Sequence, residues 1–464
     1  MSAPYDVVVI GGGPAGENAA GRCAAGGLRV ALVERELVGG ECSYWGCIPS
    51  KSLLRPGDVI AAARRVPGAA AAVTGRIDVA AVFARRDDVV GRWDDAGQLL
   101  WLAEQGVELI RGVGRLVGER LVDVVGPDGS SRRVAAERAV VLATGTRAAI
   151  PPVPGLAEVQ PWDNRSVTAT SVVPERLLVV GGGPIGVEMA QALRRLGSDE
   201  VTVVEGTDRL LGREEPFAGE ELRRAFEEEG ITVITGVTLA RVGRDPGEGT
   251  VVAELADGRT VTVDEILVAV GRRPATAEVG LETVGLAPGR FVEVDDRLRA
   301  VGAAGGWLYA VGDCNGRALL THMGKYQARI CADVILGRDV ADLADPAMVP
   351  RVTFTDPQVC AVGLTEAEAV SRGLAVRTVS YATADVAGSV VLGGGAVGTS
   401  QLVVDEGRRV IVGATFTGAA VQELLHAATV AIVGEVTLDR LWHAVPSFPT
   451  VSEVWLRLLE AYGL

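Results

Sequence analysis

Short hydrophobic runs alternate with helical patterns at the start of the chain. Residues 5–10 (YDVVVI) form a β-rich run that leads into GGGPAG, and a helical stretch then extends from Ala15 to about Ala25. A second β-rich run, RVALVE, ends at Glu34. A strand, a glycine-rich turn, a helix and a second strand in this order predict the start of a βαβ unit.

The same pattern recurs near the middle of the chain. RLLVV is followed by GGGPIG, a helical stretch and the β-rich run VTVVE, which ends at Glu205. The proline-rich segment IPPVPG, residues 150–155, precedes this second unit and marks the expected domain boundary. One chain is therefore expected to hold two Rossmann-like dinucleotide-binding folds.

The last part of the chain has a different pattern. Beyond Gly271 the run WLYAVGD is typical of an inner strand of a sheet. From about Pro346 the runs VPRVTFTD, QLVVD and RRVIVGATF indicate an antiparallel sheet with helices. We therefore expect an α/β protein with a third, C-terminal α+β domain.

Length and composition narrow the class of protein. The 464 residues are too many for one core, and no apolar run approaches the roughly 18 residues that a membrane span requires. The beginning, MSAPYDVVVIGGG, lacks the features of a signal peptide, so we expect a cytoplasmic protein. A net charge of −14 without a basic cluster disfavours nucleic acid and anionic membranes as partners.

The first glycine motif has the spacing of a phosphate-binding turn. Gly11 permits a tight turn, Gly13 lets a pyrophosphate approach the backbone, and Gly16 lets helix and strand pack closely. The positive end of the helix then faces the anion. Glu34 follows Gly16 by 18 residues, where a carboxylate can accept hydrogen bonds from ribose hydroxyls. The alternative is a glycine-rich turn without a ligand.

The second glycine motif repeats this arrangement with Gly181, Gly183 and Gly186, and Glu205 follows 19 residues later. Two such motifs imply two dinucleotides. A carboxylate at position 205 would repel a 2′-phosphate, so NADH is favoured over NADPH, although Arg209 lies nearby.

The segment GGECSYWGCIPSK, residues 39–51, contains two of the six cysteines, which are too few for a secreted disulfide scaffold. Residues five apart on a regular helix are turned by about 140°, so Cys42 and Cys47 need a local distortion to form a disulfide. The glycines of this segment can supply it. Two unrelated buried cysteines, or half of a zinc site, are the alternatives; the other cysteines and the histidines are scattered, so no metal site is expected.

The cysteine nearer the C-terminus is expected to be a stable thiolate. Residues 48–51 resemble the first turn of a helix, and Cys47 directly precedes them. The positive end of a helix dipole favours a thiolate over a thiol.

The segment GGECSYWGCIPSK resembles the GGTCxNxGCxPSK signature of the flavoprotein disulfide reductases, which include lipoamide dehydrogenase, glutathione reductase and mercuric reductase. The resemblance covers essentially the whole chain. It takes in both glycine motifs and the segments VVLATGTRAAIPPVPG, VAVGRRP, LYAVGDCNG and VTFTDPQVCAVGLTEAEA.

The resemblance implies the cofactors and the roles of site residues. The first motif would hold FAD and the second NAD(P)H, with Thr144, Gly145, Asp313 and Gly271 adding to the cofactor sites. Cys47 would be the charge-transfer thiol beside the flavin, and Cys42 the interchange thiol that faces the substrate. Lys51 would lie near flavin N5 and pair with Glu188, since a buried lysine costs less beside a carboxylate.

The resemblance also implies the domain organisation. We expect the first part of an FAD-binding domain in residues 1–150, an NAD(P)H-binding domain in 151–272, the second part of the FAD-binding domain in 273–345, and a dimerisation domain in 346–464. The protein would be a homodimer.

One family feature is missing. Disulfide reductases of this kind usually end in HPTxxE, in which the histidine exchanges protons with the interchange thiol, whereas this chain has SFPTVSE. Phe448 takes the place of the histidine, and Glu453, its usual orienting partner, remains. Losing a general acid–base costs roughly 100- to 10,000-fold in rate. His443 could substitute, but the sequence gives nothing that fixes its ring.

Three functions follow from these features. The first is an NAD(P)H oxidoreductase that passes electrons through FAD to the Cys42–Cys47 disulfide and on to an unidentified disulfide or dithiol. The second is a quinone or dye reductase, because Phe448, Tyr44 and Trp45 would make an aromatic acceptor site, although these rings could equally fill a dimer interface. The third is a non-catalytic flavin redox sensor. Mercury reduction is not expected, since mercuric reductase carries a C-terminal cysteine pair and LEAYGL contains none.

Overall fold

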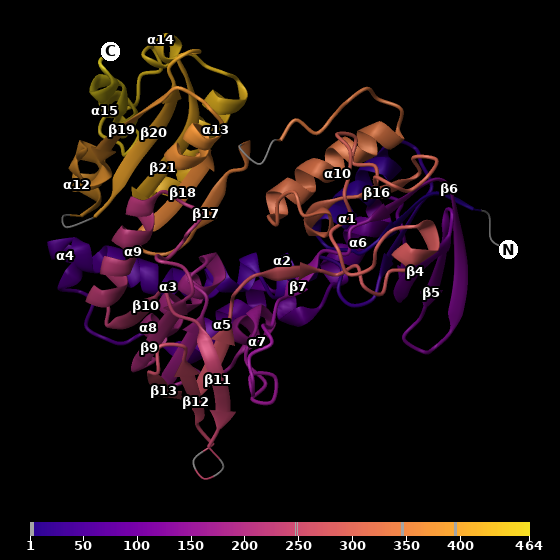
Figure 1. The fold of residues 1–464 in the computed structure, drawn as a ribbon, viewed down its shortest axis with the longest axis horizontal. Coiled ribbons are helices and arrows are strands. Elements are labelled where there is room, and N and C mark those ends of the chain that lie inside the picture. The colour runs from indigo at the N-terminus through magenta and orange to yellow at the C-terminus, as the bar shows by residue number, and fades with distance from the viewer. Residues whose placement is uncertain (1–3, 246, 248, 345–347, 394–396) are drawn as a thin grey trace. The chain divides into compact units, whose positions relative to one another are not determined.

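The computed structural model describes residues 4–245, 247, 249–344, 348–393 and 397–464. The chain divides into two compact units, each built from three separate stretches (Figure 1). Unit 1 consists of the described residues of 1–49, 86–149 and 272–343, and unit 2 of those of 50–85, 150–271 and 344–464.

Unit 1 is built on a sheet whose central strands are parallel. The order of these strands is β3 (Glu108–Arg111), β2 (Val30–Glu34), β1 (Tyr5–Ile10), β6 (Ser131–Leu142) and β16 (Leu308–Ala310). The N-terminal part of β6 also pairs antiparallel with β5 (Leu121–Val125), which pairs with β4 (Val113–Gly118). Because neighbouring parallel strands end at one edge of the sheet, the segments after β1, β6 and β16 lie close together.

Helices cover the unit 1 sheet. α1 (Pro14–Ala25) packs against both β1 and α10 (Thr321–Ile335). Unit 1 also contains the α-helices α2 (Gly40–Tyr44) and α6 (Ala96–Glu104) and the strands β7 (Thr146–Ala148) and β15 (Arg272–Pro274). Two helices continue from one unit into the other, namely α3 (Cys47–Arg65) and α5 (Val79–Val89).

Unit 2 contains a second parallel sheet, in the order β10 (Ile231–Thr235), β9 (Glu200–Glu205), β8 (Arg176–Val180) and β14 (Glu265–Val268). Its helices are α4 (Pro67–Ala70), α7 (Asn164–Ala169), α8 (Pro184–Leu196) and α9 (Pro216–Glu228). An antiparallel sheet is formed by β11 (Leu239–Arg244), β12 (Val251–Leu255) and β13 (Thr260–Val263).

Unit 2 also contains the antiparallel C-terminal sheet. Its order is β17 (Arg351–Thr353), β18 (Gln358–Gly363), β21 (Val410–Gly418), β20 (Thr399–Asp405) and β19 (Val376–Ala382). α13 (Leu424–Val433) packs on β21 and β18, and α15 (Glu453–Tyr462) packs on β19 (Figure 1). The short helices here are α11 (Glu366–Ser371), α12 (Ala387–Leu392) and α14 (Leu438–Leu441).

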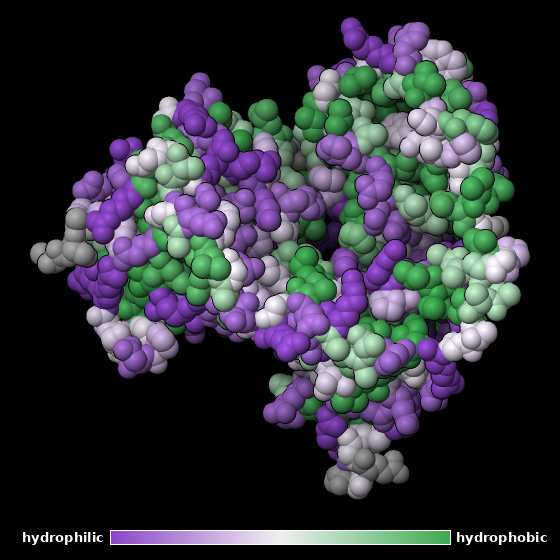
Figure 2. Space-filling view, turned by 180° about the vertical axis from the view of Figure 1, so that it is seen from behind, coloured by the Kyte–Doolittle hydropathy of each residue, from purple (hydrophilic) through white to green (hydrophobic). Residues whose placement is uncertain are grey.

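The α/β fold class with two Rossmann-like sheets is confirmed. The predicted helix from Ala15 begins one residue earlier, at Pro14, because proline suits the first turn of a helix. The four predicted domain ranges stay predictions, and the boundary at 345–346 lies outside the described residues. Hydrophilic side chains are spread over the face in Figure 2, between groups of hydrophobic ones. Within the described part of the chain, no helix has the length and apolar character needed to cross a bilayer.

Candidate active site

The first glycine motif forms a cradle in unit 1 between β1 and α1. Gly11 has φ +104°, and a Cβ on Gly16 would overlap the carbonyl oxygen of Gly11. Gly13 directly precedes α1, so the N-terminus of the helix faces the turn. This open, electropositive cradle fits a pyrophosphate. Glu34, at the end of β2, accepts a hydrogen bond from the backbone N–H of Gly12 at 2.6 Å.

Other predicted cofactor residues of unit 1 gather at the same edge of the sheet. Thr144 and Gly145 follow β6, and Gly145 has φ +68°. Asp313 follows β16 and accepts a hydrogen bond from the Thr146 hydroxyl at 2.7 Å. Burial raises the pKa of Asp313, an effect that the Thr146 hydrogen bond opposes. These residues lie at the same edge of the sheet as the cradle because three parallel strands end there, and their contact with a cofactor stays a prediction.

The second cradle, in unit 2, has the same geometry. Gly181 has φ +112°, and a Cβ on Gly186 would overlap its carbonyl oxygen, while Gly183 has open space at its Cβ position. Glu205 accepts a hydrogen bond from the backbone N–H of Gly182 at 2.6 Å. Gly271 lies three residues beyond β14, with φ +135°. This cradle, too, fits a pyrophosphate.

The two cysteines of unit 1 lie on different helices. Cys42 lies on α2, which begins after Gly39 in the left-handed conformation, and Cys47 is the first residue of α3. This break supplies the distortion that the spacing requires. A hydrogen bond between the two sulfurs is the main reason why the pKa of Cys42 is raised, and burial adds to it. Cys42 therefore holds its proton more strongly than an isolated cysteine does, and the predicted thiolate at Cys47 stays a prediction.

Three polar neighbours of this region were not predicted. The Thr321 hydroxyl lies 3.6 Å from the Cys47 sulfur, at the start of α10. Glu41, the residue before Cys42, pairs with Arg272 at 3.3 Å. The motif VAVGRRP contains Arg272, but a motif alone cannot show which carboxylate the arginine contacts.

Lys51 and Glu188, predicted as partners, form an ion pair in unit 2. The Lys51 Nζ lies 2.7 Å from Glu188 Oε2, and the Glu188 side chain is only 4% exposed. The Phe354 ring lies 4.6 Å from the same Nζ, and the backbone N–H of Phe354 donates to Glu188 Oε1 at 2.9 Å. Sequence reasoning missed Phe354, whose aromatic face stabilises a cation.

The predicted residues of the C-terminal segment differ in their exposure to solvent. Phe448 is 76% exposed, and His443 is also exposed. The buried Glu453 accepts hydrogen bonds from Arg457 at 2.6 Å and from the backbone N–H of Ala387 at 3.3 Å. Its carboxylate thus joins α15 to α12. Tyr44, another residue of the predicted aromatic acceptor site, is buried in unit 1, where burial raises its pKa to about 12, and that site stays a prediction.

These features define an oxidoreductase that binds two dinucleotides and carries a pair of redox cysteines. Comparison with known sequences then identifies the family. Residues 5–328 match the pyridine nucleotide-disulphide oxidoreductase family, and residues 349–458 match its dimerisation domain. The chain belongs to the pyridine nucleotide-disulphide oxidoreductase family.

Relatives of known activity cover nearly the whole chain. A dihydrolipoyl dehydrogenase of Chlorobaculum tepidum is 35% identical over 98% of this chain and 96% of its own. A mercuric reductase of Staphylococcus aureus is 30% identical over 97% of this chain and 81% of its own. Among solved structures, LpdA of Mycobacterium tuberculosis has a TM-score of 0.87 at 26% identity, covering 99% of this chain and 100% of its own. The HOCl-induced flavoprotein disulfide reductase RclA of Escherichia coli, as a Cu(II) complex, has a TM-score of 0.86 at 25% identity, covering 99% of both chains.

Proposed function

We propose that this protein transfers electrons from NADH, through FAD in the first cradle, to the Cys42–Cys47 pair and on to a disulfide acceptor. The observation that carries the proposal is the placement of the two cysteines at the junction of two helices, with Cys42 on α2 and Cys47 at the first position of α3. Bound FAD would supply two-electron chemistry between a nicotinamide and a disulfide. In reverse, the same pair would oxidise a dithiol.

The cysteines would exchange disulfides in two steps. The Cys42 thiol gives up its proton as its sulfur attacks one sulfur of the acceptor disulfide, which forms a mixed disulfide and releases a first thiolate, and this thiolate takes that proton. The Cys47 thiolate then attacks the Cys42 sulfur, restoring the internal disulfide and releasing the second thiolate, which takes a proton from the solvent. The acceptor gains two electrons and two protons, and Cys42 and Cys47 are oxidised.

Anaerobic titration of the FAD-loaded protein with NADH tests this assignment. Addition of two electrons should produce a long-wavelength charge-transfer absorption band, because the Cys47 thiolate would lie beside the flavin. Cys47→Ser should abolish the band, whereas Cys23→Ser, a change at a cysteine buried in the α1 core of unit 1, should leave it unchanged. A band that persists in Cys47→Ser would contradict the assignment.

A quinone or dye is the second candidate acceptor. It is favoured by an exposed apolar segment in which Trp442 is 39%, Val445 85% and Phe448 76% exposed. Cys42→Ser distinguishes the two, since direct reduction of a quinone by flavin does not need the cysteine pair, whereas reduction of a disulfide does. Loss of both activities in this variant would exclude a dispensable cysteine pair.

The missing proton-transfer group can be tested on a dithiol. Phe448→His introduces an imidazole at the family's histidine position, and we expect the rate with dihydrolipoamide to rise at least tenfold, since general acid–base catalysis contributes about 100-fold or more. Phe448→Leu is the matched control. An equal rise in both variants would assign the effect to removal of the ring.

The proposal includes NADH as the preferred donor and a homodimer as the assembly. Glu205 supports the first, because its carboxylate would repel a 2′-phosphate. Steady-state rates with NADH and NADPH test it, and Glu205→Gln should narrow the preference. The match of residues 349–458 to a dimerisation domain supports the homodimer, and sedimentation can measure the mass of the assembly. The third possibility, a non-catalytic redox sensor, would be excluded by sustained NADH turnover.

A further inference from the structure

Two ion pairs of opposite polarity join α3 to α8. Lys51 on α3 pairs with Glu188 on α8 at 2.7 Å, and Asp58 on α3 pairs with Arg195 on α8 at 3.1 Å. The second pair lies seven residues after the first on each helix, which is about 10.5 Å along the helix axis. The cation is on α3 in the first pair and on α8 in the second.

This reversal fixes the register of the two helices. If α3 slid by two turns along α8, Lys51 would face Arg195 in one direction, or Asp58 would face Glu188 in the other. Either arrangement opposes like charges on largely buried side chains, and the side chain of Arg195 is only 12% exposed. Like charges destabilise such contacts, so only the observed register satisfies both pairs.

The α3 sequence between the two pairs accommodates the arginine. A Cβ at Gly57 would lie 2.7 Å from Arg195 Cδ, so glycine lets the side chain pass close to the helix backbone. Pro56 lies inside α3 and cannot donate a backbone hydrogen bond to the preceding turn. The helix is therefore weaker between Lys51 and Asp58, and a contact on each side of the proline holds both halves in place.

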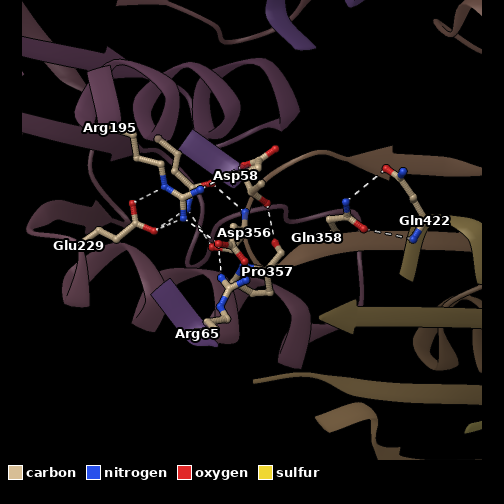
Figure 3. A network of polar contacts seen from close by, with 10 residues as sticks. Asp58, Arg65, Arg195, Glu229, Asp356, Pro357, Gln358 and Gln422 are labelled. Atoms are coloured by element: carbon tan, nitrogen blue, oxygen red, sulfur yellow. Dashed lines mark hydrogen bonds and ion pairs between the residues drawn. The ribbon is translucent and has the colours of Figure 1, made fainter. Parts of the chain in front are cut away.

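The same face of α8 holds the segment 354–356. Glu188, Gln191 and Arg195 recur at positions i, i+3 and i+7 of the helix. Gln191 donates to the Asp356 carbonyl and accepts from the Asp356 backbone N–H, both at 2.8 Å. Arg195 donates to the Asp356 carboxylate at 2.8 Å (Figure 3). Since Glu188 binds the backbone of Phe354, this polar face positions the ring that covers Lys51.

Arg195 is also fixed by a third carboxylate. Its Nε and Nη2 atoms donate to Glu229 at 3.0 and 2.6 Å, beyond the end of α9 (Figure 3). Arg65, seven residues beyond Asp58 at the end of α3, pairs with Asp356 as well. The guanidinium of Arg195 therefore joins α3, α8, the segment after α9 and the segment 354–356.

We propose that Arg195 is a positioning residue for Lys51. By holding Asp58 on one side and Asp356 on the other, it keeps the Lys51 ammonium between the Glu188 carboxylate and the Phe354 ring. The position of Lys51 matters for turnover only if the lysine acts on the flavin, so this inference rests on the proposed function for its catalytic meaning.

The lysine content of the chain allows a direct test. The sequence has only two lysines, Lys51 and Lys325, so the rate at which an amine-reactive reagent labels Lys51 can be measured by mass spectrometry against Lys325 on α10. Loss of the Glu188 charge in Glu188→Gln should raise the Lys51-to-Lys325 labelling ratio of the FAD-loaded protein roughly tenfold. Arg195→Met and Asp58→Asn should each raise it about threefold.

Arg194→Met is the matched control. Arg194 is the neighbouring residue of α8 and makes three hydrogen bonds, to the carbonyl oxygens of Ser198, Asp199 and Glu229, none of which lies on α3. We expect the labelling ratio of this variant to equal that of the wild type. A ratio unchanged in both Arg195→Met and Asp58→Asn would overturn the proposal, as would an equal rise in Arg194→Met or no rise in Glu188→Gln.

A flavin measurement separates this inference from the proposed function. The midpoint potential of bound FAD should shift in Lys51→Met, and in the same direction but by less in Arg195→Met and Asp58→Asn. An unchanged potential in Lys51→Met would refute a role of the lysine at the flavin, while the labelling ratios would still decide whether Arg195 positions it. Lower thermal stability with unchanged labelling would reduce Arg195 to a purely structural residue.

Discussion

Arg272 donates two hydrogen bonds to Thr146, from Nε to the hydroxyl at 2.6 Å and from Nη2 to the carbonyl oxygen at 3.0 Å. The Thr146 hydroxyl is thereby oriented to donate to Asp313. Arg272 also pairs with Glu41, so a single guanidinium lies among two carboxylates and a hydroxyl. The paired strands β7 and β15 supply this arrangement, because their register places Arg272 opposite Ala148, close to Thr146.

Arg272→Met should weaken FAD binding roughly tenfold, because a hydrogen bond to a charged group contributes about 1.5–3 kcal/mol and Asp313 would lose the orientation of Thr146. Fluorescence titration of the apoprotein with FAD measures the change. Arg273→Met is the matched control, since Arg273 is exposed and lies next to it on the same strand. Equal affinities for the two variants would show that the Arg272 contacts do not shape the FAD site.

Substitutions of two glycines in the second cradle should affect stability and NADH binding differently. Gly186→Ala places a Cβ on the carbonyl oxygen of Gly181 and should disrupt the turn, lowering stability by more than about 1 kcal/mol and abolishing NADH binding. Gly183→Ala meets open space, so its folding should be normal while NADH binds at least about tenfold more weakly, because the pyrophosphate must approach this backbone. Urea unfolding and NADH titration separate the two effects. Normal NADH affinity in Gly183→Ala would mean that the nucleotide does not contact this turn.

The sequence predicts the two cradles well because each depends on local chemistry. Gly11 and Gly181 need positive φ, Gly16 and Gly186 need the absence of a Cβ, and each requirement is met within one strand–turn–helix unit. The break between Cys42 and Cys47 is likewise local. Such features depend on neighbouring residues rather than on the fold around them.

Contacts between distant segments could not be predicted in the same way. Asp58 and Arg195 are 137 residues apart, and Arg195 and Asp356 are 161 residues apart. An arginine among many arginines gives no signal of its partner, and only the packing of α3 on α8 selects Asp58. The family resemblance predicts the pairing of Lys51 with Glu188, whereas nothing in the sequence predicts that Phe354 covers this pair.

Arg351→Met should lower the free energy of unfolding by about 3 kcal/mol. Arg351 on β17 forms a two-point ion pair with the buried Glu214, at 2.8 and 2.9 Å, and removing one partner leaves a buried charge without compensation. Arg223→Met is the control, because Arg223 pairs with exposed carboxylates on α9 and should cost less than about 1 kcal/mol. Urea unfolding measures both, and equal losses would show that Glu214 is solvated after the substitution.

Asp58 should make stability depend on pH in a mildly acidic range. Burial raises the pKa of Asp58 to about 6. The charges of Arg195 and Arg55 oppose this rise, and those of Asp356 and Glu229 add to it. The folded protein thus keeps this proton to higher pH than the unfolded chain, in which aspartate titrates near about 3.9. The free energy of unfolding should therefore fall as pH rises from about 4 to 6, by about 1–2 kcal/mol for this partly exposed group.

Urea unfolding of the wild type and of Asp58→Asn at several pH values between 4 and 7 measures this contribution. The variant has no carboxyl group at position 58, so its stability should fall less steeply over this range. Asp264→Asn is the contrasting control: a hydrogen bond from Arg176 lowers the pKa of Asp264, so the stability it contributes is lost only as pH falls below about 4. Above pH 4 its curve should run parallel to that of the wild type, and a parallel curve for Asp58→Asn as well would show that Asp58 does not titrate in this range.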